Sequence, residues 1–349
     1  MIDTNGFRFG RCVCALLVTA MMPLAGCSAH DSASSADTHA QQQHFKSPEE
    51  ASAALVAAVK EASQEHVLAI LGPNATDVIS SGDPVADHAA GERFTTAADE
   101  KTTPVTQDGG AVVLELGSDA WPFPIPLMKD KSGWYFDTDA GRQELINRRV
   151  GRNELHTIDV ARAYVDAQRE YARRMHNVTT RYEYAQKLRS TPGKHDGLYW
   201  EAKGSEEESP LGPLVATAQH EGYGGKPASE SPRPYHGYLF KILTAQGPHA
   251  PAGAKSYIDK GHMTGGFALV AYPAEYGAGG VMTFVVNQVG VIFQKDLGES
   301  TEQTVSAMTE YDPDDTWSPV PVTDITQDDT AADADDTGAD LDDTGDAGD

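Results

Sequence analysis

The sequence predicts an α+β fold in two parts, each with helices followed by a small antiparallel sheet. Apolar residues recur with helical spacing between Ser47 and Ala98, and again between Asn153 and Met175. Short segments with strand-like alternation follow each of these stretches. Helices and strands are therefore grouped along the chain, unlike the regular alternation of a parallel βαβ fold.

Shifts in composition along the 349 residues divide the chain into five segments. We expect a signal peptide at 1–26, a flexible lipid-anchored tether at 27–44, an α+β domain with helices plus a small curved antiparallel sheet at 45–150, a second domain with a long helix plus an antiparallel sheet at 151–320, and a disordered acidic tail at 321–349.

The N-terminus is similar to a bacterial lipoprotein signal peptide. Arg8 and Arg11 precede an apolar run that is too short to span a bilayer, and Leu24-Ala25-Gly26-Cys27 has the form of a lipobox. The likeness implies that Cys27 is acylated and that the mature chain is anchored in the cell envelope, with Ser28 favouring the outer membrane facing the periplasm. The alternatives are an ordinary secretory signal with a chance cysteine, or a buried core segment.

Charge and cysteine content restrict the partners of the protein. The formal net charge of −25 argues against nucleic acid, because a polyanion would be repelled. Cys12 and Cys14 would be removed with the signal peptide, so we expect no disulfide and no cysteine metal site. We also expect no cofactor. A calcium-loop-like stretch begins at Asp333, but Thr344 occupies the position of the bidentate carboxylate, which argues against a metal site there.

In the first part, local signals mark three helices and three strands. We expect one helix from the Ser47 cap to about Ala62, a second through Val67 to Gly72, and a third from Pro84 to Ala98 after Asp83. Strands are expected at 111–116, 123–128 and 133–137, with a hairpin turn at 129–132. Two prolines near Trp121 exclude a central strand there and predict an edge or a bulge.

Four aromatic residues on these strands are candidates for a ligand pocket. The order of elements loosely resembles the cone-shaped modules of the nuclear-transport-factor-like group, which often contain an apolar pocket. The candidates are Trp121, Phe123, Trp134 and Phe136. The alternative interpretation is that they form an ordinary core.

An arginine cluster lies between two predicted helices, Asp139–Arg148 and Asn153–Met175, with Gly151 between them. Arg148, Arg149 and Arg152 are candidates for an anion site aided by the N-terminus of the second helix. Pairing of these arginines with nearby acidic residues such as Glu144 is the alternative.

The second part contains strand-like segments bounded by glycine and proline. We expect strands at 238–243, 267–272, 282–287 and 291–294, a hairpin turn at Asn287–Gly290, and a final helix at Thr301–Tyr311 followed by a solvated acidic turn at Asp312, Asp314 and Asp315.

Several motifs between Phe45 and Val320 resemble those of one bacterial family, domain of unknown function 2950. They are Trp121-Pro-Phe-Pro-Ile-Pro-Leu127, Arg148-Arg-Val-Gly-Arg-Asn-Glu-Leu155, Ala163-Tyr-Val-Asp-Ala-Gln-Arg-Glu-Tyr-Ala172, Tyr235-His-Gly-Tyr238, Leu243-Thr-Ala-Gln-Gly-Pro248 and Gly280-Val-Met-Thr-Phe-Val-Val-Asn287. The family has no established activity, so the likeness implies export but assigns no catalytic residue. The second part also weakly resembles the globular domains of type IV pilins and pseudopilins, which would favour partner binding over catalysis.

The chain contains no Gly-x-Ser-x-Gly elbow, no His-Glu-x-x-His motif and no phosphate-binding loop. His236, His249 and His262 could be metal ligands or a base, or ordinary surface or core residues. We therefore predict a cell-envelope lipoprotein that binds an unknown envelope protein without catalysis. The alternative is an envelope hydrolase or small-ligand-binding protein that uses the aromatic pocket.

Overall fold

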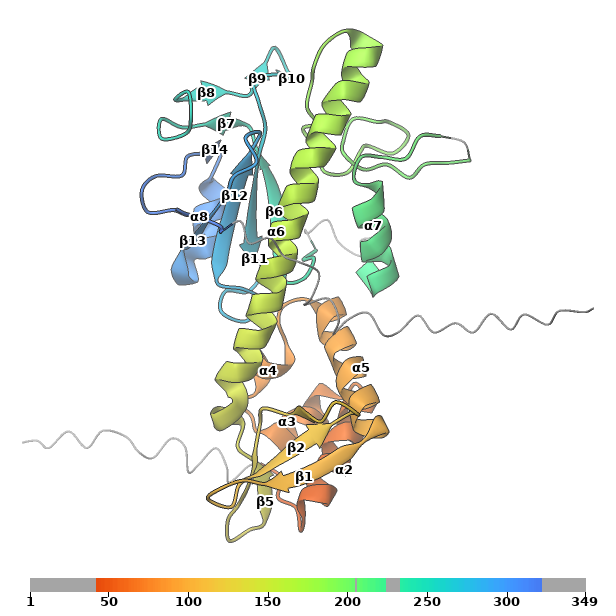
Figure 1. Cartoon of the computed structure of the whole chain (residues 1–349), viewed down its shortest axis with the longest axis vertical. Coiled ribbons are helices and arrows are strands. Elements are labelled where there is room, and N and C mark those ends of the chain that lie inside the picture. Colours follow the sequence, from red (N-terminus) through yellow and green to blue (C-terminus); the bar gives the residue numbers. More distant parts are fainter. Residues whose placement is uncertain (1–41, 205, 224–232, 322–349) are drawn as a thin grey trace, which may run out of the picture.

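The computed structural model describes residues 42–204, 206–223 and 233–321. It confirms the α+β class: helices and antiparallel sheets form two hydrophobic cores, and one long helix runs past both (Figure 1). The signal peptide, Cys27, most of the tether and the acidic tail lie outside the described residues and stay predictions, as does the division into two domains. No helix of the described chain is long and apolar enough to cross a membrane.

The folded part begins earlier than the predicted tether allows. Gln42 is buried, and its side-chain amide donates to the carbonyls of Ile70 (2.7 Å) and Phe136 (2.8 Å). Phe45 forms a bridge with Trp134 and is also buried. Residues 42–44 therefore belong to the first core and not to the tether, because local composition does not reveal these distant partners.

Three helices pack on the first sheet: α2 (Pro48–Lys60), α3 (Gln64–Leu71) and α5 (Pro84–Glu100). The short helix α4 (Thr76–Ile79) packs against the long helix that follows the sheet. The predicted caps are present. The Ser47 hydroxyl accepts from the N–H of Glu50 (3.2 Å), and the Asp83 carboxylate accepts from the first turn of α5. Leu55, Ile70 and Leu71 fill the core beneath these helices.

The first sheet consists of β1 (Thr102–Thr106), β2 (Val112–Leu116), β3 (Trp121–Pro122), β4 (Leu127–Lys129) and β5 (Trp134–Phe136), in the order β1-β2-β4-β5, with β3 pairing with β2. The predicted strand at 123–128 is largely wrong: only Leu127 and Met128 belong to β4, because Pro124 and Pro126 have no N–H to donate. The exposed β3 agrees with the prediction of an edge. The unpredicted β1 is an edge strand, which tolerates Pro104.

Helix α6 (Thr138–Thr179) is continuous over 42 residues, so the prediction of two helices separated near Gly151 is wrong. A glycine within a helix costs only about 1 kcal/mol relative to alanine. Packing at both ends of α6 outweighs this cost: Gly141 lies against Pro124 and Ile125 of the first core, and Tyr164 is buried in the second. At about 1.5 Å per residue the helix is about 60 Å long, and the boundary placed at residue 150 falls inside it, about a third of the way along.

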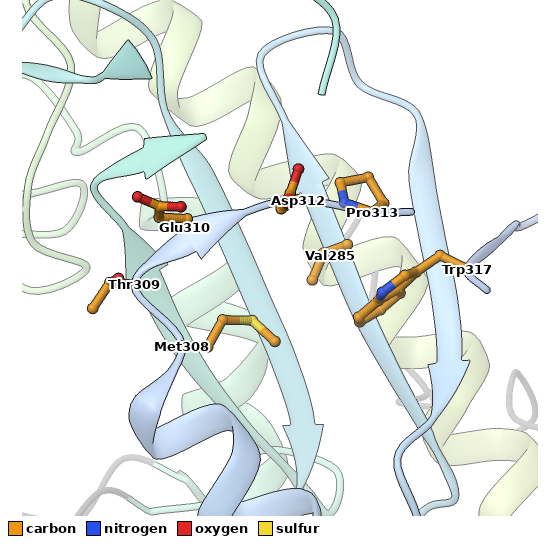
Figure 2. Close-up of a pocket in the computed structure, with 7 residues that line it drawn as sticks. All are labelled: Val285, Met308, Thr309, Glu310, Asp312, Pro313 and Trp317. Carbon is orange, nitrogen blue, oxygen red and sulfur yellow. The ribbon is translucent and has the colours of Figure 1, made fainter. Parts of the chain in front are cut away.

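The second sheet has the order β15-β13-β12-β11-β6, and all of its pairs are antiparallel. Its strands are β6 (Tyr238–Leu243), β11 (Ala268–Pro273), β12 (Met282–Asn287), β13 (Ile292–Asp296) and β15 (Ser318–Pro319). The four predicted strands and the Asn287–Gly290 turn are confirmed to within about two residues at each end. Helix α6 packs on one face of this sheet, and α8 (Thr301–Ala307) packs on the other (Figures 1 and 2).

The last predicted helix is too long. Helix α8 ends at Ala307, and Glu310–Tyr311 forms β14, which runs parallel to β7 (Ala245–Gln246). The ammonium group of Lys241 donates to the carbonyls of Val305 (2.9 Å), Ser306 (2.9 Å) and Met308 (2.7 Å). A cation at the C-terminus of a helix satisfies the last carbonyls, and here it terminates α8 three residues before Glu310.

The remaining elements are short. They are α7 (Gly212–Ala218), the helical turn η1 (Gln219–Tyr223), β8 (Lys255–Ser256), β9 (Ile258–Asp259), β10 (His262–Met263) and the 3₁₀ turn η2 (Gly298–Ser300). Helix α7 lies on the far side of α6 from the second sheet (Figure 1). Strands β14, β7 and β8 form a second small sheet, so β14 is an edge strand beside the face that α8 covers.

Candidate functional site

The arginines of the predicted anion site lie inside α6, about three to four turns after its N-terminus. Because α6 is continuous, no helix begins after Gly151, and the helix N-terminus on which the anion hypothesis depended does not exist. Arg148 donates to Glu144 (2.7 Å), and its guanidinium lies 5.7 Å from the centre of the Trp121 ring. The predicted pairing with Glu144 is therefore confirmed, and Arg152 lies one turn further on at an exposed position.

Arg149 connects the two cores. Its guanidinium donates to the carbonyls of Asp77, Val78 (3.1 Å) and Ala278 (2.8 Å). Burial lowers the pKa of Arg149, and the nearby carboxylates of Asp87 and Asp77 oppose this shift. With three backbone carbonyls as partners, this side chain fastens α6 to both halves of the protein.

The four aromatic residues of the predicted pocket are separated by the structure into two groups. Phe123 and Phe136 are buried in the first core and meet edge to face at 6.2 Å, with Trp121 at the surface beside Phe123. Trp134 is half-buried and packs under the ammonium group of Lys129. The two phenylalanines occupy the space that a ligand would need, so they act here as core residues.

The three predicted histidines lie at different places, and each is beside its own carboxylate. His236 contacts Glu221 (3.1 Å), His249 contacts Asp312 (2.9 Å) and His262 contacts Glu183 (2.9 Å). Within the described residues, no group of three His, Cys, Asp or Glu side chains is arranged to hold a metal ion.

His236 belongs to a polar cluster that joins the two cores. Its ring stacks on His156 of α6 at 4.2 Å, and its backbone N–H donates to the hydroxyl of Tyr223 (3.2 Å). The same hydroxyl donates to Asp83 (2.9 Å), the cap of α5, which also accepts from the N–H of Gly237 (2.9 Å). Burial is the main cause that lowers the pKa of His236 and raises that of Tyr223. These contacts connect the cap of α5, the middle of α6 and the turn before β6.

A groove of about 290 Å³ lies on the face of the second sheet that is opposite α6 (Figure 2). It is lined by Val285, Met308, Thr309, Glu310, Asp312, Pro313 and Trp317. Ligand pockets commonly measure about 300–1,000 Å³, so this groove suits a small ligand or one side chain of a larger partner. A second cavity, beside Arg142, measures about 10 Å³, which is room for a single water molecule.

The two walls of the groove differ chemically. In Figure 2, Glu310 lies on one side and Trp317 on the other, with Asp312, Pro313 and Val285 between them. Val285 belongs to the central strand β12, is 2% exposed and forms an apolar floor. The groove therefore offers an apolar surface and carboxylates within the same small volume.

Asp312 is held in place by a turn more than sixty residues earlier in the chain. Its carboxylate accepts from the backbone N–H of His249 (2.7 Å) and contacts the ring of the same residue (2.9 Å). A methyl group on Gly247 would lie 2.3 Å from the Asp312 side chain, so only glycine fits beneath it. Hydrogen bonding to Asp312 raises the pKa of His249.

Trp317 is positioned by a second set of contacts. The ammonium group of Lys295 lies 5.8 Å from the centre of its ring and donates to Thr316 (2.6 Å). Asp314 accepts from the N–H and the hydroxyl of Thr316 and thereby shapes the turn before the tryptophan. The turn that the sequence predicted to be merely solvated is thus one wall of the groove.

Sequence reasoning did not find this site. It noted Asp312 and His249 separately, and it did not single out Glu310 or Trp317. The parallel pairing of β14 with β7 brings these residues together, and no periodicity within a short window carries that information. Trp317 was the available signal, because a tryptophan beside acidic residues is unusual in a solvated turn.

The fold and the groove define an α+β protein with two cores, a shared long helix and an open acidic and aromatic groove. The chain belongs to the family described as protein of unknown function DUF2950, whose model matches residues 42–320. Neither curated proteins nor solved structures yield a match to this chain. The likeness to pilins and the loose likeness to nuclear-transport-factor-like modules therefore stay predictions.

Proposed function

We propose that this protein is a lipid-anchored binding protein of the bacterial cell envelope, and that the groove between β14 and Trp317 is where it binds its partner. The groove is the observation that carries this proposal. It combines an apolar floor with polar walls, as binding sites commonly do. The lipobox that ends at Cys27 supports the anchored state.

A binding role agrees better with the aromatic residues than the alternative of a hydrolase or ligand-binding protein that uses an N-terminal pocket. Phe123 and Phe136 pack against each other within the first core. A ligand could enter there only if these side chains moved apart, and opening such a core is costly. We therefore place partner binding in the second half of the molecule.

Site-specific photo-crosslinking in intact cells tests the proposal. A photoreactive amino acid at Thr309, an exposed groove residue, should yield a discrete adduct with one partner. The same amino acid at Glu201, an exposed residue of the loop after α6, serves as the matched control and should not yield that adduct. Absence of an adduct at Thr309, or the same adduct at both positions, would refute binding at the groove.

The anchored location is tested separately. A Cys27→Ser variant should lose its acyl mass and appear in the soluble fraction, while the parent chain remains with the membrane. Equal retention of both forms would show that the lipid does not anchor the chain.

A further inference from the structure

The groove contains one carboxylate that is already engaged and one that is not. Both oxygens of Asp312 have a partner in His249, and the side chain is 28% exposed. The Glu310 carboxylate, in contrast, makes no hydrogen bond and no ion pair with any described residue. Glu310 is therefore the group in this groove that is available to a ligand.

The surrounding charges make the open end of the groove negative. Glu310 and Asp312 line the groove, and the carboxylates of Asp314 and Asp315 are close enough to His249, the partner of Asp312, to help raise its pKa. The basic groups beside the groove are already engaged: Lys241 donates to the carbonyl of Met308 (2.7 Å), Lys295 to Thr316 beneath the face of Trp317, and the ring of His249 contacts Asp312. An anionic ligand would be repelled here, whereas a cation would be attracted.

The rest of the groove suits an aliphatic chain. Val285, Met308 and Pro313 provide apolar contact, and the indole of Trp317 forms a flat wall on the side opposite Glu310 (Figure 2). A wholly apolar ligand would remove the Glu310 carboxylate from water without giving it a partner, which is unfavourable. An aliphatic stem that ends in a positive charge satisfies both walls at once.

We propose that the groove binds a basic side chain of a partner protein, with the aliphatic stem against Val285 and Trp317 and the charged end at Glu310. This inference rests on the proposed function, because it names the chemistry that the same groove recognises. The occupant is chosen by charge complementarity, and the net charge of −25 of the whole chain would also attract a basic partner.

The test uses two small probes with the same four-carbon side chain, Nα-acetyl-lysine methylamide and its norleucine counterpart, which lacks the terminal ammonium group. Binding to the full folded chain is followed by tryptophan fluorescence and by NMR shifts of the Trp317 indole. The lysine probe should bind about fivefold more tightly than the norleucine probe, in line with one partly exposed ion pair. Added salt should reduce this preference, since salt screens exposed charges. Attaching the lysine to a longer peptide should strengthen binding, whereas an isolated alkylamine should bind no better than the lysine probe.

Two variants locate the effect. Glu310→Gln should remove the preference for the lysine probe, whereas Glu201→Gln, which deletes the same charge from the loop after α6, should retain it. Circular dichroism and thermal unfolding should be unchanged in both variants, because both side chains are exposed.

Equal binding of the two probes, no binding of either probe, or unchanged preference in Glu310→Gln would each overturn the inference. Binding of the isolated alkylamine as tight as that of the lysine peptide would also overturn it, because the ligand would then be a free amine. These outcomes are separate from the crosslinking result at Thr309, which alone decides whether the groove contacts a partner.

Discussion

The substitutions Gly141→Ala and Gly151→Ala add the same methyl group to the same helix, and we expect opposite effects on stability. At Gly141 the new carbon would lie 2.5 Å from the carbonyl oxygen of Pro124 and 2.6 Å from the Cα of Ile125. At Gly151 no atom lies within 4 Å, and the residue is exposed. The pair therefore separates helix propensity from packing.

The expected magnitudes follow from these distances. Overfilling a packed site costs about 1–3 kcal/mol, and we expect the upper end at Gly141 because backbone atoms cannot rotate away. Alanine regains about 1 kcal/mol of helix propensity, so Gly141→Ala should lower the free energy of unfolding by about 2 kcal/mol. Gly151→Ala has only the favourable contribution and should raise it by about 0.5–1 kcal/mol.

Thermal unfolding monitored by circular dichroism measures both effects. For a folded part of this size, the loss at Gly141 corresponds to a fall in Tm of about 4–8 °C, and the gain at Gly151 to a rise of about 1–4 °C. A Tm for Gly141→Ala at or above that of the parent would refute the close packing of α6 on the first core. A destabilised Gly151→Ala protein would show that the helix is interrupted there, as local periodicity had predicted.

Three further predictions concern side chains that the structure places in specific roles. NMR titration should find the pKa of His249 above its ordinary value of 6.5 and a lower pKa in Asp312→Asn. Because the folded-state pKa is raised, the pair stabilises the fold at low pH and loses this contribution as the pH rises through the raised pKa. An unchanged pKa in the variant would contradict the contact. Lys241→Met should lower the free energy of unfolding, measured in urea, by about 1–3 kcal/mol, because the terminal carbonyls of α8 lose their donor. Amide hydrogen exchange in α8 should become faster. Unaltered exchange would argue against this cap. Asp83→Ala should lower the free energy of unfolding by about 2–4 kcal/mol, since it removes a helix cap and the acceptor of the Tyr223 hydroxyl. Tyr223→Phe, which removes only the hydroxyl, should lower it clearly less. Equal losses in the two variants would mean that capping contributes little.

Local signals predicted the elements that depend on a few adjacent residues. The Ser47 and Asp83 caps and the Asn287–Gly290 turn were found because each requires particular residue types within four positions. Strands β11 and β12 were found because they are nearly continuous apolar runs.

Elements whose state depends on distant partners were missed. Strand β14 is only two residues long and exists because β7 lies beside it. The break predicted near Gly151 was wrong because α6 packs on a different core at each end. Strand β1 was missed because Pro104 argues against a strand unless the strand is known to lie at an edge.

The sequence by itself determined the α+β class, the starting points of the helices and the strands of the second sheet, since these follow from hydrophobic period and from the chemistry of caps and turns. Only the tertiary structure decided that Phe123 and Phe136 form a core, that Arg149 joins the two halves, and that Glu310 and Trp317 face each other across one groove. The physical reason is range: periodicity records which face of an element is buried, whereas a site requires knowledge of which buried faces and loops meet, and that depends on the packing of the whole chain.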